Sequence, residues 1–242
     1  MYNWYESWFD TKFYHILYEK RNKLEANFFI KNLIEKLQIS KNKIFLDVAC
    51  GKGRHTKEIA GLGYKIEGID LSLKSIKYAK DFENELLKFT LFDMRKVFKK
   101  NYFDIVLNLF TSFGYFETID ENEKALKSIL QNLNNDGMII IDFMNVKKVV
   151  KNLVASEEII KSNVNFKIHR KHENKKITKD IYFKYKGKNH HYVENVFALT
   201  LSDFSKMLNK FGYEIINLWG NYNFKDFNEE KSERLIISAK RF

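Results

Sequence analysis

The feature that most constrains this chain is the stretch from Ile44 to Ser72, which reads as strand, glycine-rich turn, helix and second strand. An apolar run opens it, Gly51 and Gly53 permit a tight turn with close backbone approach, and 56–62 has a helical pattern. The second strand ends on an acid, Asp70, which suits ribose hydroxyls. Free N–H groups and the positive dipole end at the helix start attract an anionic group. The stretch therefore predicts a pocket for an adenosine-bearing cofactor.

The third glycine position of this turn separates two kinds of cofactor. A dinucleotide fingerprint has glycine or alanine where this chain has Thr56, so that helix and strand pack closely beneath a pyrophosphate. The larger threonine disfavours a nicotinamide oxidoreductase, whereas a cofactor without pyrophosphate tolerates it. A further alternative stays open at this point, namely that the glycines serve only the turn.

The residues of the turn carry a longer motif. The pattern D-x-A-C-G-x-G-R-H is matched at Asp47, Ala49, Cys50, Gly51, Gly53, Arg54 and His55. It resembles the first motif of the class I S-adenosylmethionine-dependent methyltransferases. The resemblance implies S-adenosylmethionine as the cofactor, with Asp47, Gly51 and Gly53 among the residues that bind it.

Length and composition favour a soluble enzyme with one main core. The chain has 242 residues, of which 45% are hydrophobic and 16% aromatic, enough for a sizeable core in one or two domains. No run reads as a membrane span, and the first ten residues carry Glu6 and Asp10 instead of a basic, apolar leader. We therefore expect a cytoplasmic protein. The single cysteine, Cys50, makes no internal disulfide and is expected to pack under the cofactor.

The positive charge leaves the kind of partner open. A net charge of +11 suits nucleic acid, but it is almost all lysine, scattered among Asn, Ile, Phe and Tyr in a chain without proline. Because these residues have A/T-rich codons, genome composition is the favoured explanation. One local exception is 161–191, where ten lysines and arginines crowd together. It is predicted to be a substrate-facing basic surface or a set of solvated strands.

Alternating strands and helices run as far as Phe143 and predict a parallel sheet covered on both faces. The helices expected here lie at 22–37 and 121–133, the latter capped by Asp120 with Glu123. The third, fourth and fifth strands are expected at 89–92, 103–109 and 138–143, with a turn at 135–137 before the fifth. This order fits a Rossmann-like, doubly wound α/β fold.

The pattern changes after Phe143. Three strands at 164–170, 177–185 and 192–199 follow without intervening helices, which predicts a small antiparallel β insertion. Thr200 with Asp203 caps a helix that runs through Phe211 and is stopped by Gly212, and final strands follow at 213–219 and 235–239. In the resembled enzymes the last two strands form an antiparallel hairpin that completes seven strands, and such an insertion roofs the substrate site. We therefore expect a cofactor-binding core at 1–147 and 200–242, and a substrate cover at 148–199.

The resemblance assigns further cofactor contacts. It implies that Asp70 and Leu71 hold the ribose, that Asp93 and Met94 flank the adenine, and that Asn108 ends the fourth strand where substrate and cofactor meet. The aromatic-rich first 18 residues resemble a lid, in which aromatic faces stabilise a sulfonium and an arginine pairs with the methionine carboxylate. Tyr14 and Arg21 are favoured for these roles. An aromatic helix face packed on the core is the alternative.

No acceptor side chain stands out from the sequence. The candidates that could shape or deprotonate a substrate are Tyr115, Asp142, His190, His191, Tyr222 and Arg234. A chain without proline lacks the Asn-Pro-Pro-aromatic motif of amino-directed nucleic-acid methyltransferases, and its one cysteine disfavours cytosine C5 chemistry. The His and acid spacings match no standard metal motif.

Three functions follow from these observations. The first is methyl transfer from S-adenosylmethionine to a nitrogen or oxygen of a small molecule. The second is an RNA-modifying methyltransferase that docks RNA on the basic insertion, and the third is a non-catalytic methyltransferase-like binding protein. A monomer and a homodimer are both compatible with the sequence, since edge strands of the insertion could pair between subunits.

Overall fold

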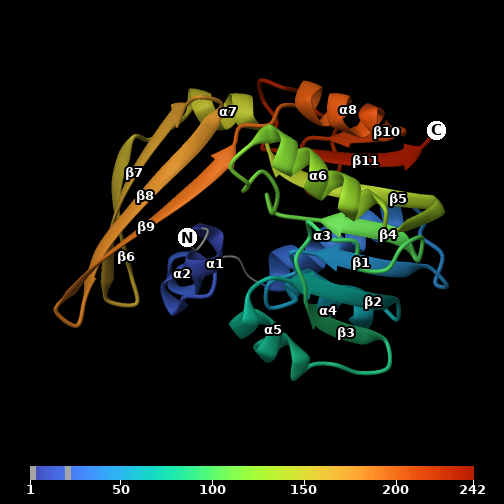
Figure 1. The fold of residues 1–242 in the computed structure, drawn as a ribbon, viewed down its shortest axis with the longest axis horizontal. Helices are drawn as coiled ribbons and strands as arrows, with labels where there is room; N and C mark the ends of the chain where they lie inside the picture. The colour runs from blue at the N-terminus through green and yellow to red at the C-terminus, as the bar shows by residue number, and fades with distance from the viewer. Residues whose placement is uncertain (1–3, 20–22) are drawn as a thin grey trace.

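Two β-sheets organise the protein (Figure 1). The computed structural model describes residues 4–19 and 23–242. A seven-stranded sheet has the order β10-β11-β5-β4-β1-β2-β3, and a separate four-stranded sheet has the order β6-β7-β8-β9. The seven strands are β1 (Ile44–Val48), β2 (Lys65–Asp70), β3 (Leu87–Leu91), β4 (Phe103–Asn108), β5 (Leu133–Met144), β10 (Tyr213–Trp219) and β11 (Arg234–Arg241).

The helices belong to three parts of the chain. Those at the amino terminus are α1 (Trp4–Trp8), α2 (Lys12–Leu17) and α3 (Lys23–Lys36). Those between the strands of the large sheet are α4 (Arg54–Gly61), α5 (Leu73–Lys80), α6 (Ile119–Leu130) and α8 (Leu201–Lys210). The short α7 (Val146–Lys151) leads from β5 into the four-stranded sheet.

The strand directions confirm the predicted doubly wound sheet with a final hairpin. β1 pairs in parallel with β2 and β4. On one side β3 pairs in parallel with β2, and on the other side β5 pairs in parallel with β4. β11 is antiparallel to both β5 and β10. Phe45, Leu46 and Val48 are fully buried because both sheet faces are covered. The carboxyl ends of β1, β2 and β4 meet at one edge, where open α/β sheets bind ligands.

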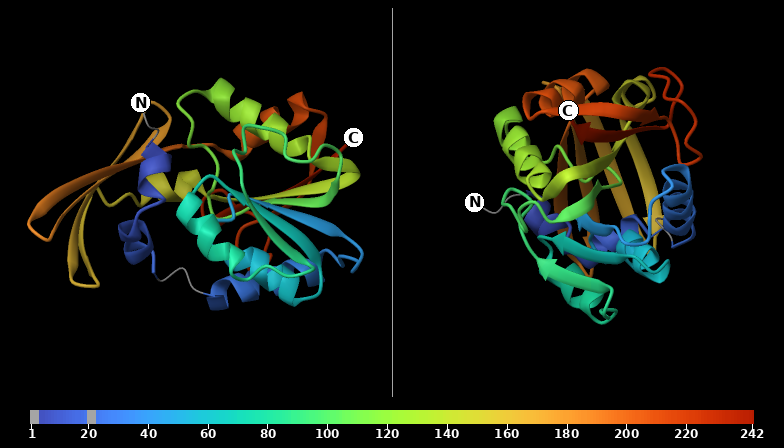
Figure 2. Two further views of the ribbon diagram at one scale, coloured as in Figure 1. Left: turned by 60° about the horizontal axis from the view of Figure 1, so that its bottom comes forward. Right: turned by 90° about the vertical axis from the view of Figure 1, so that its right-hand side faces the viewer.

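Each face of the large sheet has its own layer of helices, as the end-on view in Figure 2 shows. Phe29 of α3, Ile59 of α4 and Ile76 of α5 pack into one apolar cluster with Ile66 and Ile140. Leu126 of α6 and Phe204 of α8 pack into the cluster on the opposite face. Helices therefore cover the large sheet on both of its faces.

Local details differ from the sequence expectation at the ends of two elements. The helix after β4 is capped by Thr118 with Glu121 in a capping box, not by Asp120 with Glu123. Strand β5 already begins at Leu133, so the expected turn at 135–137 lies within it. The pairing with β4 jumps from Leu133 to Met138, which makes this turn-like segment an irregularity of the strand.

The four-stranded sheet is antiparallel throughout and contains one strand that the sequence did not predict. Its strands are β6 (Ser156–Lys161), β7 (Val164–Glu173), β8 (Lys176–Tyr185) and β9 (Lys188–Phe197). Only alternate residues of β6 are even partly buried, so its apolar signal is weak. Trp8, Phe13 and Leu17 of α1 and α2 pack on this sheet against a buried row that includes Phe166 and Ile181.

In the part of the chain that the structure describes, no helix is long and apolar enough to cross a membrane.

Candidate active site

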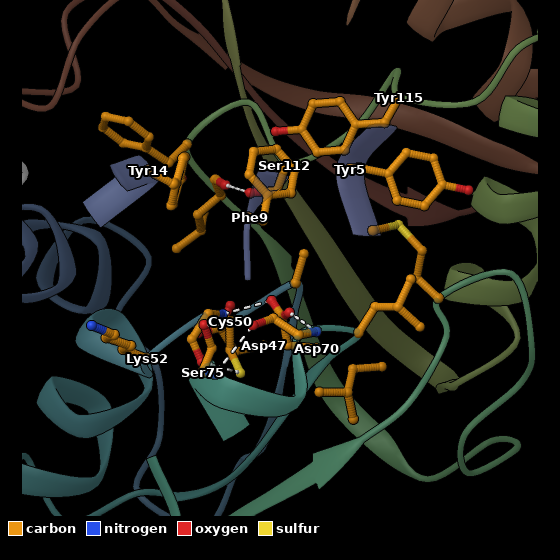
Figure 3. A pocket seen from close by; sticks show the side chains of 18 of the residues that line it. Tyr5, Phe9, Tyr14, Asp47, Cys50, Lys52, Asp70, Ser75, Ser112 and Tyr115 are labelled. Carbon is orange, nitrogen blue, oxygen red and sulfur yellow. Dashed lines mark hydrogen bonds between the residues drawn. The ribbon is translucent and has the colours of Figure 1, made fainter. Parts of the chain in front are cut away.

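A cavity of about 400 Å³ lies at the carboxyl edge of the large sheet, beneath α1 and α2. Its volume is within the range of small-molecule sites. Figure 3 looks into it: Asp47, Cys50 and Asp70 lie on one side, and the aromatic rings of Tyr14 and Tyr115 lie across from them. The glycine-rich turn and the amino-terminal aromatic segment, far apart in sequence, therefore enclose one space.

The glycine-rich turn after β1 depends on residues with positive φ. Gly51 has φ of 56° and Gly53 of 71°. A Cβ atom on Gly53 would lie 2.4 Å from the Phe89 ring, so that this position requires glycine for space as well as for conformation. The compact turn brings the backbone to the cavity and starts α4 at Arg54.

Asp70 is held at the end of β2 by the main chain. Its Oδ2 accepts the N–H of Gly51 at 2.8 Å, and its Oδ1 accepts the N–H of Ser72 at 2.7 Å. Burial raises the pKa of Asp70, while these backbone hydrogen bonds oppose the rise. Each carboxylate oxygen keeps a further lone pair, and the side chain lines the cavity. This arrangement is able to accept hydrogen bonds from two neighbouring hydroxyls.

Asp47 lies at the floor of the same cavity and is almost fully buried. Its Oδ2 accepts a hydrogen bond from Thr56 Oγ1 at 2.6 Å. Burial raises the pKa of Asp47 to about 7, and the Thr56 hydrogen bond works against this rise. Thr56 stands where a dinucleotide fingerprint has its third glycine. Its hydroxyl holds the Asp47 carboxylate, a role that the sequence did not reveal.

The segment after β3 contributes Asp93 and Met94 to the cavity wall. Both oxygens of Asp93 accept hydrogen bonds from Arg95, the shortest of them 2.6 Å from Nη2. Burial raises the pKa of Asp93, but the Arg95 hydrogen bonds outweigh it, and the pKa lies below its ordinary value. Leu71 also lines the cavity. The Asp93 carboxylate is therefore oriented by Arg95, a neighbour that sequence reasoning left out.

Asn108 ends β4 at the expected place, but its amide contacts the main chain. Its side chain is almost fully buried and is not among the groups that line the cavity. Its Nδ2 donates to the carbonyl oxygens of Val48 and Ser112, at 3.3 and 3.2 Å. Asn108 thus ties the end of β1 to the loop after β4, beneath the cavity.

The aromatic segment covers the cavity from the other side. Tyr5, Phe9 and Tyr14 line it together with Tyr115 from the loop after β4. Arg21, which the sequence proposed as a carboxylate partner, lies outside the described residues. His15, which the sequence analysis did not single out, also lines the cavity; burial and the nearby Lys52 lower its pKa to about 4. It is therefore neutral near pH 7.

Asp10 joins this cover to the core. Its Oδ1 accepts the hydroxyl of Ser72 at 2.7 Å and the N–H of Lys74 at 2.9 Å. Burial raises the pKa of Asp10, yet the Ser72 and Lys74 hydrogen bonds bring it below its ordinary value. Since Ser72 also donates its N–H to Asp70, the cover and the acid at the end of β2 meet at one residue.

A second cavity of about 350 Å³ adjoins the first and lies against the four-stranded sheet. Four residues line both spaces, namely Phe9, Tyr14, Phe110 and Tyr115. The second cavity is otherwise lined by six apolar side chains, one hydroxyl and four charged groups: Trp4, Met144, Val149, Leu153, Ile177, Val196, Thr111, Arg170, Lys179, Glu194 and Arg234. Two small molecules could therefore occupy adjoining sites separated by aromatic rings.

Three of the acceptor candidates form one buried network behind this boundary. Asp142 Oδ1 accepts Arg234 Nε at 2.7 Å, and its Oδ2 accepts Tyr222 OH at 3.0 Å and the Phe110 N–H at 2.9 Å. Burial, reinforced by the Asp142 charge, raises the pKa of Tyr222. Phe110 and Thr111 have φ of 61° and 60°. The network therefore holds two strained residues at the boundary between the cavities.

The two candidate histidines of the insertion, His190 and His191, line neither cavity. The His191 side chain is 46% exposed, lies 2.8 Å from Asp180 and stacks on Tyr182 with ring centroids 4.2 Å apart. His190 stacks on Phe183 and contacts Phe13, so that it helps to hold α2 against the sheet. Among the described residues no cluster of His, Cys, Asp and Glu could hold a metal ion.

Comparison with known proteins relates this chain to methyltransferases. Residues 46–141 match the family model described as "Methyltransferase domain". An S-adenosylmethionine-dependent methyltransferase from Clostridium acetobutylicum has the same fold, with a TM-score of 0.79 at 19% identity over 94% of this chain and 95% of that one. The CcbJ methyltransferase from Streptomyces caelestis gives a TM-score of 0.80 at 12% identity, covering 98% of each chain.

A curated relative is also similar in sequence. The dTDP-3-amino-3,4,6-trideoxy-alpha-D-glucopyranose N,N-dimethyltransferase of Streptomyces venezuelae is 30% identical over 99 residues, which are 40% of each protein. The matches to curated relatives span between 31% and 68% of their lengths. Residues 46–141 thus match a methyltransferase domain, and the chain as a whole has the fold of the class I S-adenosylmethionine-dependent methyltransferases.

Proposed function

We propose that this protein transfers the methyl group of S-adenosylmethionine to a nitrogen or oxygen of a small molecule. The observation that carries this proposal is the pair of adjoining cavities that share Phe9, Tyr14, Phe110 and Tyr115. One cavity has the acids and the glycine-rich turn that suit the cofactor, and the other is enclosed by the four-stranded sheet. The acceptor and the methyl donor thereby meet at the shared aromatic residues.

The residues of the first cavity fit the cofactor. Asp70 has lone pairs for the two ribose hydroxyls, and Asp47 offers a carboxylate to a cationic amino group. Met94 and Leu71 provide apolar surface for the adenine. When bound, S-adenosylmethionine supplies a methyl group activated by a positive sulfonium.

The chain's own contribution to the reaction is placement. The aromatic residues at the boundary exclude water, and their faces stabilise positive charge near the sulfur. An attack in line on a methyl group depends mainly on proximity and orientation. Asp142 serves this purpose indirectly, because it accepts the N–H of Phe110 and so fixes the loop that separates the two sites. No side-chain base is required for an acceptor that reaches the site already deprotonated.

The charges of the insertion favour a small molecule over RNA. Lys167 pairs with Glu158 at 3.2 Å and Lys171 with Glu173 at 3.0 Å, on the outer side of the sheet. These pairs interrupt the positive surface that counterion release from RNA would need.

The first experiment is a calorimetric titration of the purified protein with S-adenosylhomocysteine, S-adenosylmethionine and NAD. We expect micromolar binding of the two adenosyl ligands and none of NAD. A turnover screen then measures S-adenosylhomocysteine release with small-molecule amines and phenols, and with total RNA. Absence of adenosyl-ligand binding contradicts the proposal, and turnover with RNA alone replaces the small-molecule acceptor with a nucleic acid.

A further inference from the structure

The second cavity is lined by more cations than acids. Arg170, Lys179 and Arg234 line the cavity, together with a single acid, Glu194. These four side chains are between 13% and 21% exposed. The acids that pair with the two arginines, Glu157 and Asp142, do not line the cavity. The space inside therefore faces more positive than negative groups.

The strand register makes this arrangement unusual. Arg170 on β7 lies directly opposite Lys179 on β8, and Lys179 lies opposite Glu194 on β9. Like charges directly opposite one another in an antiparallel pair destabilise a sheet. Here both also point into a partly buried space, where repulsion is stronger than in water. Lys179 pairs with Glu194 at 3.7 Å and Arg170 pairs with Glu157, and an anion bound between the two cations would add to this compensation.

Arg234 adds a third donor group on the same cavity. Its Nε donates to Asp142, and its Nη2 donates to Thr111 Oγ1 at 3.1 Å. Among the residues that the structure describes, none accepts a hydrogen bond from its Nη1. A guanidinium fixed on one side by a buried carboxylate is well suited to bind a second anion on the other.

We propose that the acceptor is an anionic small molecule, whose carboxylate or phosphate group binds Arg170, Lys179 and Arg234 while its reacting nitrogen or oxygen lies at the aromatic boundary. This inference rests on the proposed function, because it names the acceptor class of that site. The apolar remainder of the cavity, including Met144 and Ile177, suits the carbon body of the same molecule.

The test uses three probes of similar size on the protein loaded with S-adenosylhomocysteine. Benzoate carries a carboxylate, phenyl phosphate carries a phosphate, and benzamide is the neutral counterpart. We expect calorimetry to show at least one anionic probe binding about tenfold more tightly than benzamide, with a preference that weakens as salt is added. The stronger of the two anions identifies the group as carboxylate or phosphate.

Two double variants locate the effect. Replacing Arg170→Gln together with Lys179→Gln is expected to abolish the preference for the anion while leaving S-adenosylhomocysteine affinity unchanged. The matched control, Lys171→Gln with Lys184→Gln, removes the same charge from exposed residues of the same strands that line neither cavity, and retains the preference. Circular dichroism and melting curves verify that both variants fold, and Arg170→Lys keeps the charge if the glutamine variant unfolds.

The possible outcomes distinguish failure of the anionic-acceptor proposal from failure of the proposed function. Equal binding of benzamide and the anions overturns the anionic acceptor, and so does a lack of any probe binding to protein that binds S-adenosylhomocysteine. A preference that survives in the Arg170/Lys179 variant overturns the assignment of these residues. Failure of S-adenosylhomocysteine itself to bind instead contradicts the proposed function.

Discussion

The two cavities are built by different kinds of contact. In the first cavity, which we propose binds the cofactor, the main chain fixes Asp70, whose carboxylate accepts N–H groups from Gly51 and Ser72. In the acceptor cavity side chains hold one another: Glu194 accepts Trp8 Nε1 at 2.7 Å and Tyr18 OH at 2.8 Å, and Arg170 pairs with Glu157. The first site depends on the backbone conformation of the glycine-rich turn, whereas the second depends on the identity of particular side chains. The first should be sensitive to substitutions that strain the turn, and the second to substitutions that remove one member of a pair.

The largest expected effect compares one glycine from each region. Gly53→Ala should lower the free energy of unfolding by about 3 kcal/mol, because the new methyl group adds overpacking against Phe89 to the strain of a positive φ. Gly187→Ala, in the hairpin between β8 and β9, has a φ of 78° but open space around it, and should cost about 1 kcal/mol. Urea denaturation measures both. Equal losses would remove the distinction between the two regions.

The next effect is on the cofactor. Asp70→Asn should weaken S-adenosylhomocysteine binding about 100-fold, because charge-assisted hydrogen bonds to the ribose are lost. Asp81→Asn, at the exposed C-terminal end of α5, removes the same charge near the same helix and should leave binding unaltered. Calorimetry compares the two variants. A loss below about threefold for Asp70→Asn would mean that the acid is not a ligand.

A smaller effect is the pH dependence of cofactor binding. Burial raises the pKa of Asp47 to about 7, so that its carboxyl is largely neutral below that pH. A cationic ligand favours the ionised form, and affinity for S-adenosylhomocysteine should therefore rise about tenfold from pH 6 to pH 8. Asp47→Asn should flatten this dependence.

The same pKa has the opposite effect on the protein without ligand. The folded state binds the Asp47 proton more tightly than the unfolded state, in which the pKa is about 4. Stability from this group is present at low pH and is lost as pH rises from about 4 to about 7. Urea denaturation of the wild type and of Asp47→Asn at several pH values gives the difference.

The smallest expected effect is at His191, which the sequence proposed for the substrate pocket. His191→Ala should change turnover by less than about twofold, because the ring lies on the outer face of the four-stranded sheet. His15→Ala, in the cofactor cavity, should weaken S-adenosylhomocysteine binding about fivefold. A strong loss of turnover in His191→Ala would place the acceptor on the outer face.

The features that could be predicted from the sequence are local patterns, and the features that were missed are contacts between side chains. The turn at Gly51 and Gly53 and the buried run at β1 are local patterns, and they led to the correct fold. The role of Thr56 in holding Asp47 was missed because it depends on a contact between side chains. Arg170 and Lys179 were visible only as part of a basic run, since the register that brings them together is set by the hairpins of the insertion.

Asn108 shows a further limit of sequence reasoning. It ends β4 at the expected place, yet its amide turns toward Val48 and Ser112 instead of the cavity. Position along the chain could be predicted, but the direction of one side chain depends on which buried carbonyls need a donor.

The double use of Ser72 has a kinetic consequence. The Ser72 N–H donates to Asp70, and the Ser72 hydroxyl donates to Asp10 of the aromatic cover. Movement of the cover away from the core therefore breaks a hydrogen bond at the same residue that orients Asp70. In the proposed complex, opening of the aromatic cover and loosening of the ribose contacts are therefore coupled. We expect this opening to contribute to the rate at which S-adenosylhomocysteine leaves, since such motions in other covered enzymes take microseconds to milliseconds and often limit the turnover rate.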